Sequence, residues 1–103
     1  MISREDFVFT IGFDGERAVV DGRARRQYGK LGTMELAEKG LYRAAFSSAL
    51  WTLENSGDSR DEGEMRQFID FFNKLAGTSF TKMEELQRLF GVAYEEVTKI
   101  LLL

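Results

Sequence analysis

The stretch from Thr33 to Glu54 constrains the fold of this chain more than any other. Its apolar residues first follow the three-and-four spacing of one helix face, and from Ala44 onward they spread around most of the cylinder. A helix that is apolar on most sides is normally covered on most sides. We therefore expect one long central helix over residues 33–54, about 30 Å in length, with the rest of the chain packed around it.

The composition argues against several classes of chemistry. The 103 residues include no cysteine and no histidine, which removes disulfides, thiolate metal sites and the commonest general base. We therefore predict a protein that is not an enzyme, with no catalytic, metal-binding or cofactor-binding residues. No apolar run has membrane-spanning length, and the first residues lack the apolar stretch of a secretion signal. These features favour a cytoplasmic protein of one domain, without a membrane partner.

Residues 7–21 predict a β-hairpin. Apolar residues from Phe7 to Phe13 alternate with smaller ones, and Asp14-Gly15 separates them from a second run that ends at Asp21. A type I′ turn at Asp14-Gly15 would pair Phe13 with Glu16 and continue one aromatic face across both strands. Two strands alone are marginal in water, so the hairpin either lies on the helices or joins a second copy edge to edge.

Three shorter helices are predicted after the central one. Capping patterns at Asp61–Glu64 and Thr81–Glu84 open the first two, which end at Gly77 and Gly91, and Tyr94–Leu102 forms the last. Nothing after the hairpin is typical of a third strand. The predicted fold is therefore α+β: an N-terminal two-stranded antiparallel hairpin packed on about four helices around the central one.

The connector Gly22–Gly32 is the best candidate for contact with an anion. It holds four positive side chains and no acidic one, and it precedes the N-terminus of the central helix, where free backbone N–H groups favour anions. Its spacing fits neither a Walker A loop nor a dinucleotide fingerprint. The alternative is a solvated basic turn. The candidate residues are Arg23, Arg25, Arg26 and Lys30.

Residues 82–101 resemble the helix-turn-helix of bacterial repressors. In that family an apolar residue precedes a glycine by five positions, and a valine, a small residue and two buried aliphatic residues follow. The matching positions are Leu86, Gly91, Val92, Ala93, Val97 and Ile100. The resemblance implies that the exposed face of the second helix contacts DNA, with Tyr94, Thr98 and Lys99 as the favourable residues.

The same segment departs from the family where DNA would be contacted. Gln87 stands where the family usually has alanine, and Glu95 and Glu96 would be repelled by phosphates. The alternative is a purely structural helical hairpin. The chain also has a net charge of −3, which disfavours a nucleic acid partner without excluding a local basic patch.

Two functions are compatible with these patterns. The first is a non-catalytic regulatory or protein-interaction module that self-associates, as a homodimer or with a protein partner. It is suggested by the open hairpin edges and by Leu101–Leu103, an apolar segment that one helix face cannot bury. The second is a DNA-binding regulator that uses the C-terminal helix pair, with Arg25, Arg26 and Lys30 on phosphates.

Overall fold

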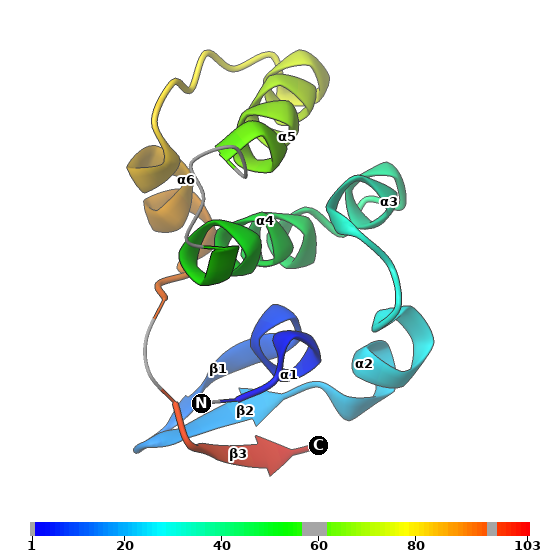
Figure 1. Ribbon diagram of the computed structural model, residues 1–103, viewed down its shortest axis with the longest axis vertical. Helices are drawn as coiled ribbons and strands as arrows, with labels where there is room; N and C mark the ends of the chain where they lie inside the picture. Colours follow the sequence, from blue (N-terminus) through cyan, green and yellow to red (C-terminus); the bar gives the residue numbers. More distant parts are fainter. Residues whose placement is uncertain (1, 57–61, 95–96) are drawn as a thin grey trace.

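The computed structural model describes residues 2–56, 62–94 and 97–103. These residues form six helices and three strands, which confirms the predicted α+β class and the N-terminal hairpin. Figure 1 shows the sheet at one end of the molecule, α1 between the sheet and α4, and helices α3, α5 and α6 around the other sides of α4. In chain order the elements are α1 (Arg4–Val8), β1 (Thr10–Asp14), β2 (Arg17–Val20), α2 (Gly22–Tyr28), α3 (Thr33–Glu38), α4 (Tyr42–Ser56), α5 (Glu62–Ala76), α6 (Met83–Phe90) and β3 (Lys99–Leu102).

The prediction of one long helix over residues 33–54 is wrong, because the chain breaks between α3 and α4. Gly40 adopts φ +81°, a conformation that ends a helix. The amide of Leu41 donates to the carbonyl of Leu36 at 3.0 Å, and that of Gly40 donates to the carbonyl of Ala37 at 3.0 Å, the pattern of a helix closed by a left-handed residue. Glycine inside a helix costs only about 1 kcal/mol, so the sequence pattern allowed both outcomes.

Helix α4 nevertheless has the central place that its composition predicts. All six residues from Ala45 to Leu50 are at most 1% exposed, while Ala44 and Trp51 are half-buried. Helices α1, α3 and α5 pack against it, and Phe46 stacks on Phe90 of α6 with ring centroids 5.6 Å apart. The core therefore surrounds the middle of α4.

A chain of polar contacts crosses this core. Arg4 of α1 donates to the hydroxyl oxygen of Ser48 at 2.8 Å, and that oxygen lies 2.8 Å from the hydroxyl of Thr33. The Thr33 hydroxyl also hydrogen-bonds to the carboxylate of Glu64 on α5. Since a buried hydroxyl without a partner is costly, these contacts explain how α4 can carry a buried serine.

The hairpin has a different register from the predicted one. Asp14 pairs with Arg17, so Gly15 and Glu16 form the loop. Only glycines have positive φ among the described residues, which excludes the predicted type I′ turn because that turn needs positive φ at both central positions. This register places Phe13 opposite Ala18, and a shift at Ile11 then brings Thr10 opposite Val20. The predicted continuous aromatic face does not form.

Residues 4–8, partly assigned to the first strand, form helix α1. Ser3 caps this helix by accepting a hydrogen bond from the amide of Asp6 at 3.2 Å. Phe7 and Phe9 are still buried, but they reach the core from the helix and from its C-terminal cap. A short helix and a strand with alternating aromatics are hard to distinguish over so few residues.

The predicted basic connector contains helix α2. Asp21, which the sequence pattern places at the end of a strand, caps α2 by accepting a hydrogen bond from the amide of Ala24 at 3.1 Å. The predicted helix ends at Gly77 and Gly91 are confirmed. The cap of α6 is one residue later than predicted, at Lys82, and the predicted cap residue Asp61 lies outside the described residues.

The predicted last helix over Tyr94–Leu102 is wrong, because residues 99–102 form strand β3. This strand pairs in parallel with β2, opposite β1, and gives a sheet of order β1-β2-β3. The second edge of β2 needs hydrogen-bonding partners, and the apolar run Ile100–Leu102 provides them together with a hydrophobic face. Nine residues are too few for periodicity to decide between helix and strand.

Candidate interaction surface

The outer edge of β3 is a strand edge that no other described strand pairs with. The amide of Leu103 donates to the carbonyl of Val20 at 3.0 Å, and its carbonyl accepts from the amide of Gly22 at 3.2 Å. Both backbone groups of Leu103 therefore point toward β2. Because the direction alternates along a parallel strand, the N–H and C=O groups of Ile100 and Leu102 point outward. No strand lies beyond β3 among the described residues.

The side chains along this edge are apolar and exposed. Register places Ile100 beside Ala18 and Leu102 beside Val20, so each shares a sheet face with a fully buried residue of β2. Ile100 is nevertheless 36% exposed and Leu102 46% exposed. The strand thus extends the buried face of the sheet to an edge that the described helices leave uncovered.

The opposite edge, along β1, is less suited to pairing. The register shift at Ile11 interrupts the regular ladder, and such bulges are a common protection of sheet edges. Ile11 and Phe13 are both more than half exposed, but they belong to an irregular strand that ends in the charged residue Asp14. Of the two edges, β3 is the regular one.

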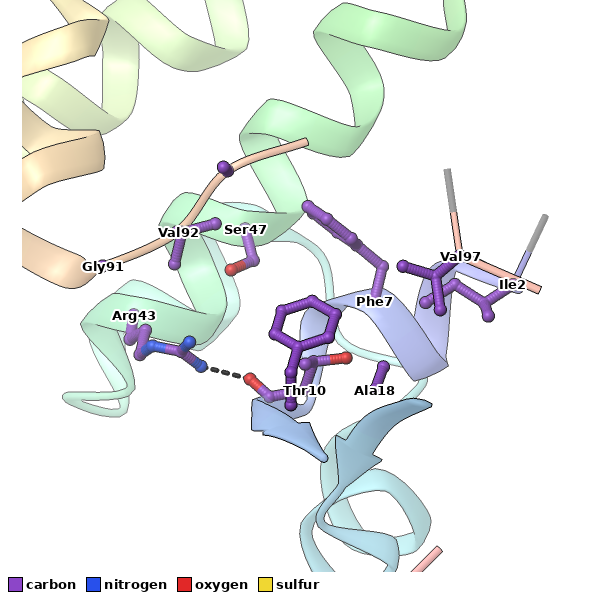
Figure 2. Close-up of a pocket in the computed structure, with 11 residues that line it drawn as sticks. Ile2, Phe7, Thr10, Ala18, Arg43, Ser47, Gly91, Val92 and Val97 are labelled. Carbon is purple, nitrogen blue, oxygen red and sulfur yellow. Dashed lines mark hydrogen bonds between the residues drawn. The ribbon is translucent and has the colours of Figure 1, made fainter. Parts of the chain in front are cut away.

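A small cavity lies between the sheet and α4. Figure 2 shows Phe7, Thr10, Ala18, Arg43, Val92 and Val97 around it, contributed by α1, the hairpin, α4 and the segment that leads to β3. Its volume is about 30 Å³, enough for one or two water molecules and too small for an organic ligand. The cavity is therefore a packing feature beneath the last segment of the chain.

Arg43 forms the polar wall of this cavity. Its guanidinium donates to the carbonyl of Thr10 (Figure 2) and, through Nε at 3.1 Å, to the carbonyl of Phe90. Burial lowers the pKa of Arg43 below its usual value, because the charged form loses hydration. The side chain remains a cation at neutral pH and joins β1 to the end of α6.

The predicted anion-contact residues lie on or just after α2. Arg25, Arg26 and Lys30 line one open hollow, whereas Arg23, one turn earlier, is exposed and does not line it. The guanidinium of Arg25 pairs with the carboxylate of Asp6 on α1. The structure therefore brings three of the four residues together.

The other predicted contacts lie elsewhere. Tyr94 packs against Phe7 and Trp51, and its hydroxyl accepts a hydrogen bond from Asn55 at 3.1 Å. Thr98 precedes β3, and Lys99, its first residue, pairs with Arg17 at the hairpin end of β2. Helix α2 follows the opposite end of β2. The predicted contacts on the connector and those at Tyr94, Thr98 and Lys99 therefore do not form one face. Glu95 and Glu96 lie outside the described residues.

The described residues offer neither a cluster of metal-ligating side chains nor a membrane-spanning helix. Within residues 2–56, 62–94 and 97–103, no group of three or more metal-ligating side chains is gathered where it could hold an ion. No helix in that part of the chain combines the length and the apolar character needed to cross a membrane.

The sequence gives no indication of Arg4 as a site residue, and it places Leu102 on the wrong element. Arg4 lines the same hollow as Arg25 and also anchors the loop after α2, but nothing in its sequence neighbourhood indicates contacts with residues 25 to 44 positions away. Leu102 belongs to the apolar segment that the sequence predicts to be exposed, but the sequence pattern places it on a helix. The sequence feature that could have predicted the strand is the run of aliphatic residues over 100–103.

The fold and these surfaces define a small α+β protein with an open mixed sheet. Comparisons of the chain with family models, with curated proteins and with solved structures found no match. The resemblance of residues 82–101 to a helix-turn-helix is therefore neither supported nor opposed by a relative.

Proposed function

We propose that this protein is a non-catalytic interaction module that self-associates through the outer edge of β3. The observation that carries the proposal is a regular edge strand whose outward backbone groups belong to two exposed apolar residues, Ile100 and Leu102. Unpaired strand edges of this kind pair readily with another strand, and exposed apolar side chains add a driving force.

A second copy of the same strand fits this edge. Two identical strands related by a two-fold axis run antiparallel. With the axis at Leu101, each Ile100 exchanges both backbone hydrogen bonds with Leu102 of the other copy, because both residues have outward N–H and C=O groups. The paired side chains are all aliphatic and lie on the face that continues from Ala18 and Val20.

Charge placement is also compatible with this pairing. Lys99 is the only charged residue of β3. In the two-fold arrangement Lys99 lies opposite Leu103 of the other copy, so the two ammonium groups are at opposite ends of the interface. Like charges directly opposite one another would destabilise a pair of strands, and this register avoids them.

The proposal is tested by the concentration dependence of the mass in solution. We expect sedimentation equilibrium to show a monomer–dimer equilibrium for the natural sequence. Leu102→Pro removes an outward N–H from each copy but none of the hydrogen bonds from β3 to β2. It should therefore raise the dissociation constant of the dimer about tenfold or more, while the monomer stays folded.

A matched pair of variants separates the two sheet edges. Leu102→Lys on β3 should abolish the dimer, whereas Ile11→Lys on β1, at a similarly exposed apolar position, should leave it unchanged. A natural sequence that stays monomeric at all concentrations would overturn the proposal. So would a dimer that is sensitive to Ile11→Lys and insensitive to Leu102→Lys.

A further inference from the structure

We propose that the hollow between α1 and α2 binds a small phosphate-bearing molecule, a function independent of self-association at β3. The hollow is open, with a volume of about 510 Å³. The side chains that line it include four cations and one carboxylate: Arg4, Arg25, Arg26, Lys30 and Glu5. Gly29, where α2 ends, completes its wall.

This concentration of positive charge is unusual for the molecule. The whole chain has a net charge of −3, yet the segment Gly22–Gly32 contains four basic residues and no acidic one. Folding adds Arg4 from a distant part of the sequence to three of these residues. Although Asp6 pairs with Arg25 and Glu5 lies 3.8 Å from Arg4, the positive charges remain in excess around the hollow.

Two of the guanidinium groups are held in place before any ligand arrives. Arg4 donates to the carbonyl of Gly29 at 3.2 Å, to the carbonyl of Leu31 at 2.8 Å and to Ser48. Arg25 is held by Asp6. Fixed donors lose less conformational entropy on binding than mobile side chains do.

The other two cations have no such structural task. Arg26 and Lys30 are exposed, and neither has an ion pair among the described residues. A fixed pair of guanidinium groups beside two mobile cations suits a phosphate, which offers several charged oxygens in a compact group and accepts bidentate hydrogen bonds from arginine. A single carboxylate would satisfy fewer of these donors.

The test uses inorganic pyrophosphate as the probe, titrated into the full chain and followed by amide chemical shifts and by calorimetry. We expect saturable binding with shifts concentrated at residues 4–5 and 25–31. Arg26→Gln and Lys30→Gln should each weaken binding about threefold to fivefold, the effect of losing one exposed charge contact.

Arg23→Gln is the matched control, because it removes the same charge from the same helix at a position outside the hollow. It should change the affinity less, because the Arg23 side chain does not line the hollow and offers the ligand no direct contact. Absence of saturable binding would overturn the proposal, and so would equal losses in Arg23→Gln and Arg26→Gln.

A second arm distinguishes the source of the phosphate. Single-stranded oligonucleotides should displace pyrophosphate only through their terminal phosphates, so their apparent affinity should not increase with length. An affinity that grows with oligonucleotide length and falls with Arg23→Gln would mean a nucleic acid interface along α2, and would contradict a site for a small molecule. The self-association test remains separate, since none of these substitutions touches β3.

Discussion

Gly40 separates α3 from α4 through its backbone conformation. At φ +81° a residue with a Cβ is strained whatever space surrounds it, and the nearest non-neighbouring atom to a Cβ at Gly40 would be the hydroxyl of Tyr42 at an ordinary 3.9 Å. The cost of substitution there is therefore a backbone cost. Gly63, within helix α5, differs because it needs no positive φ.

The first prediction compares these two glycines. Gly40→Ala should lower the free energy of unfolding by about 1–2 kcal/mol, the cost of a left-handed residue that has a Cβ. Gly63→Ala should raise it by up to about 1 kcal/mol, because alanine is the better helix former and a Cβ there meets nothing within 4 Å. Denaturant unfolding of both variants measures this. Equal effects at the two sites would contradict the assignment of Gly40 to a helix end.

At the scale of the element, α6 shows how a local cap shapes a short helix. Glu85 in its first turn reaches back and accepts hydrogen bonds from the amides of Thr81 at 3.2 Å and of the N-cap residue Lys82 at 3.1 Å. The bond from Thr81, followed by the one from Lys82, lowers the pKa of Glu85 below its usual value of 4.5. The helix then ends at Gly91, and the chain is free to continue toward β3.

The second prediction follows from the direction of that pKa shift. A carboxyl group with a lowered pKa in the folded state stabilises the fold fully above pH 4.5, and this contribution is lost as the pH falls through the folded-state value. Natural protein should therefore be more stable than Glu85→Gln at neutral pH, and the difference should shrink in acid. Unfolding curves of both proteins across the pH range check this. A difference that is constant with pH would contradict the proposed cap.

At the scale of the whole molecule, Arg43 joins parts of the chain that are far apart in sequence. From α4 it reaches the carbonyl of Thr10 at the start of β1 and the carbonyl of Phe90 at the end of α6. Arg43 and Thr10 both line the cavity in Figure 2, and Phe90 directly precedes Gly91, another lining residue. One side chain thus ties the sheet to the helical end of the molecule.

The third prediction concerns this tie. Arg43→Met keeps much of the side-chain volume but leaves both carbonyls without their donor, so the free energy of unfolding should fall by about 2–3 kcal/mol. Arg43→Lys should recover only part of the loss, because an ammonium group cannot reproduce the planar fork of a guanidinium. Arg23→Met, at an exposed site, should have almost no effect. A loss in Arg43→Met no larger than in Arg23→Met would show that the tie is energetically unimportant.

Among the candidate sites, the sequence identified three of the four cations of the hollow and the apolar character of the last residues. It could not find Arg4, because Arg4 meets Arg25 and Arg26 only after α1 packs beside α2. It placed Leu102 on a helix face, because a short aliphatic run is compatible with both periods. Residue types were thus predictable, but their neighbours were not.

What the sequence by itself determined is the α+β class, the hairpin and the burial of Ala45–Leu50, because these depend on residue composition and local turn signals. Only the tertiary structure decided the register of the hairpin, the break at Gly40 and the strand over Lys99–Leu102. Helix and strand propensities differ by only about 1 kcal/mol per residue, so local preference decides such choices weakly. Contacts with distant parts of the chain then select between them, as the second edge of β2 does for strand β3.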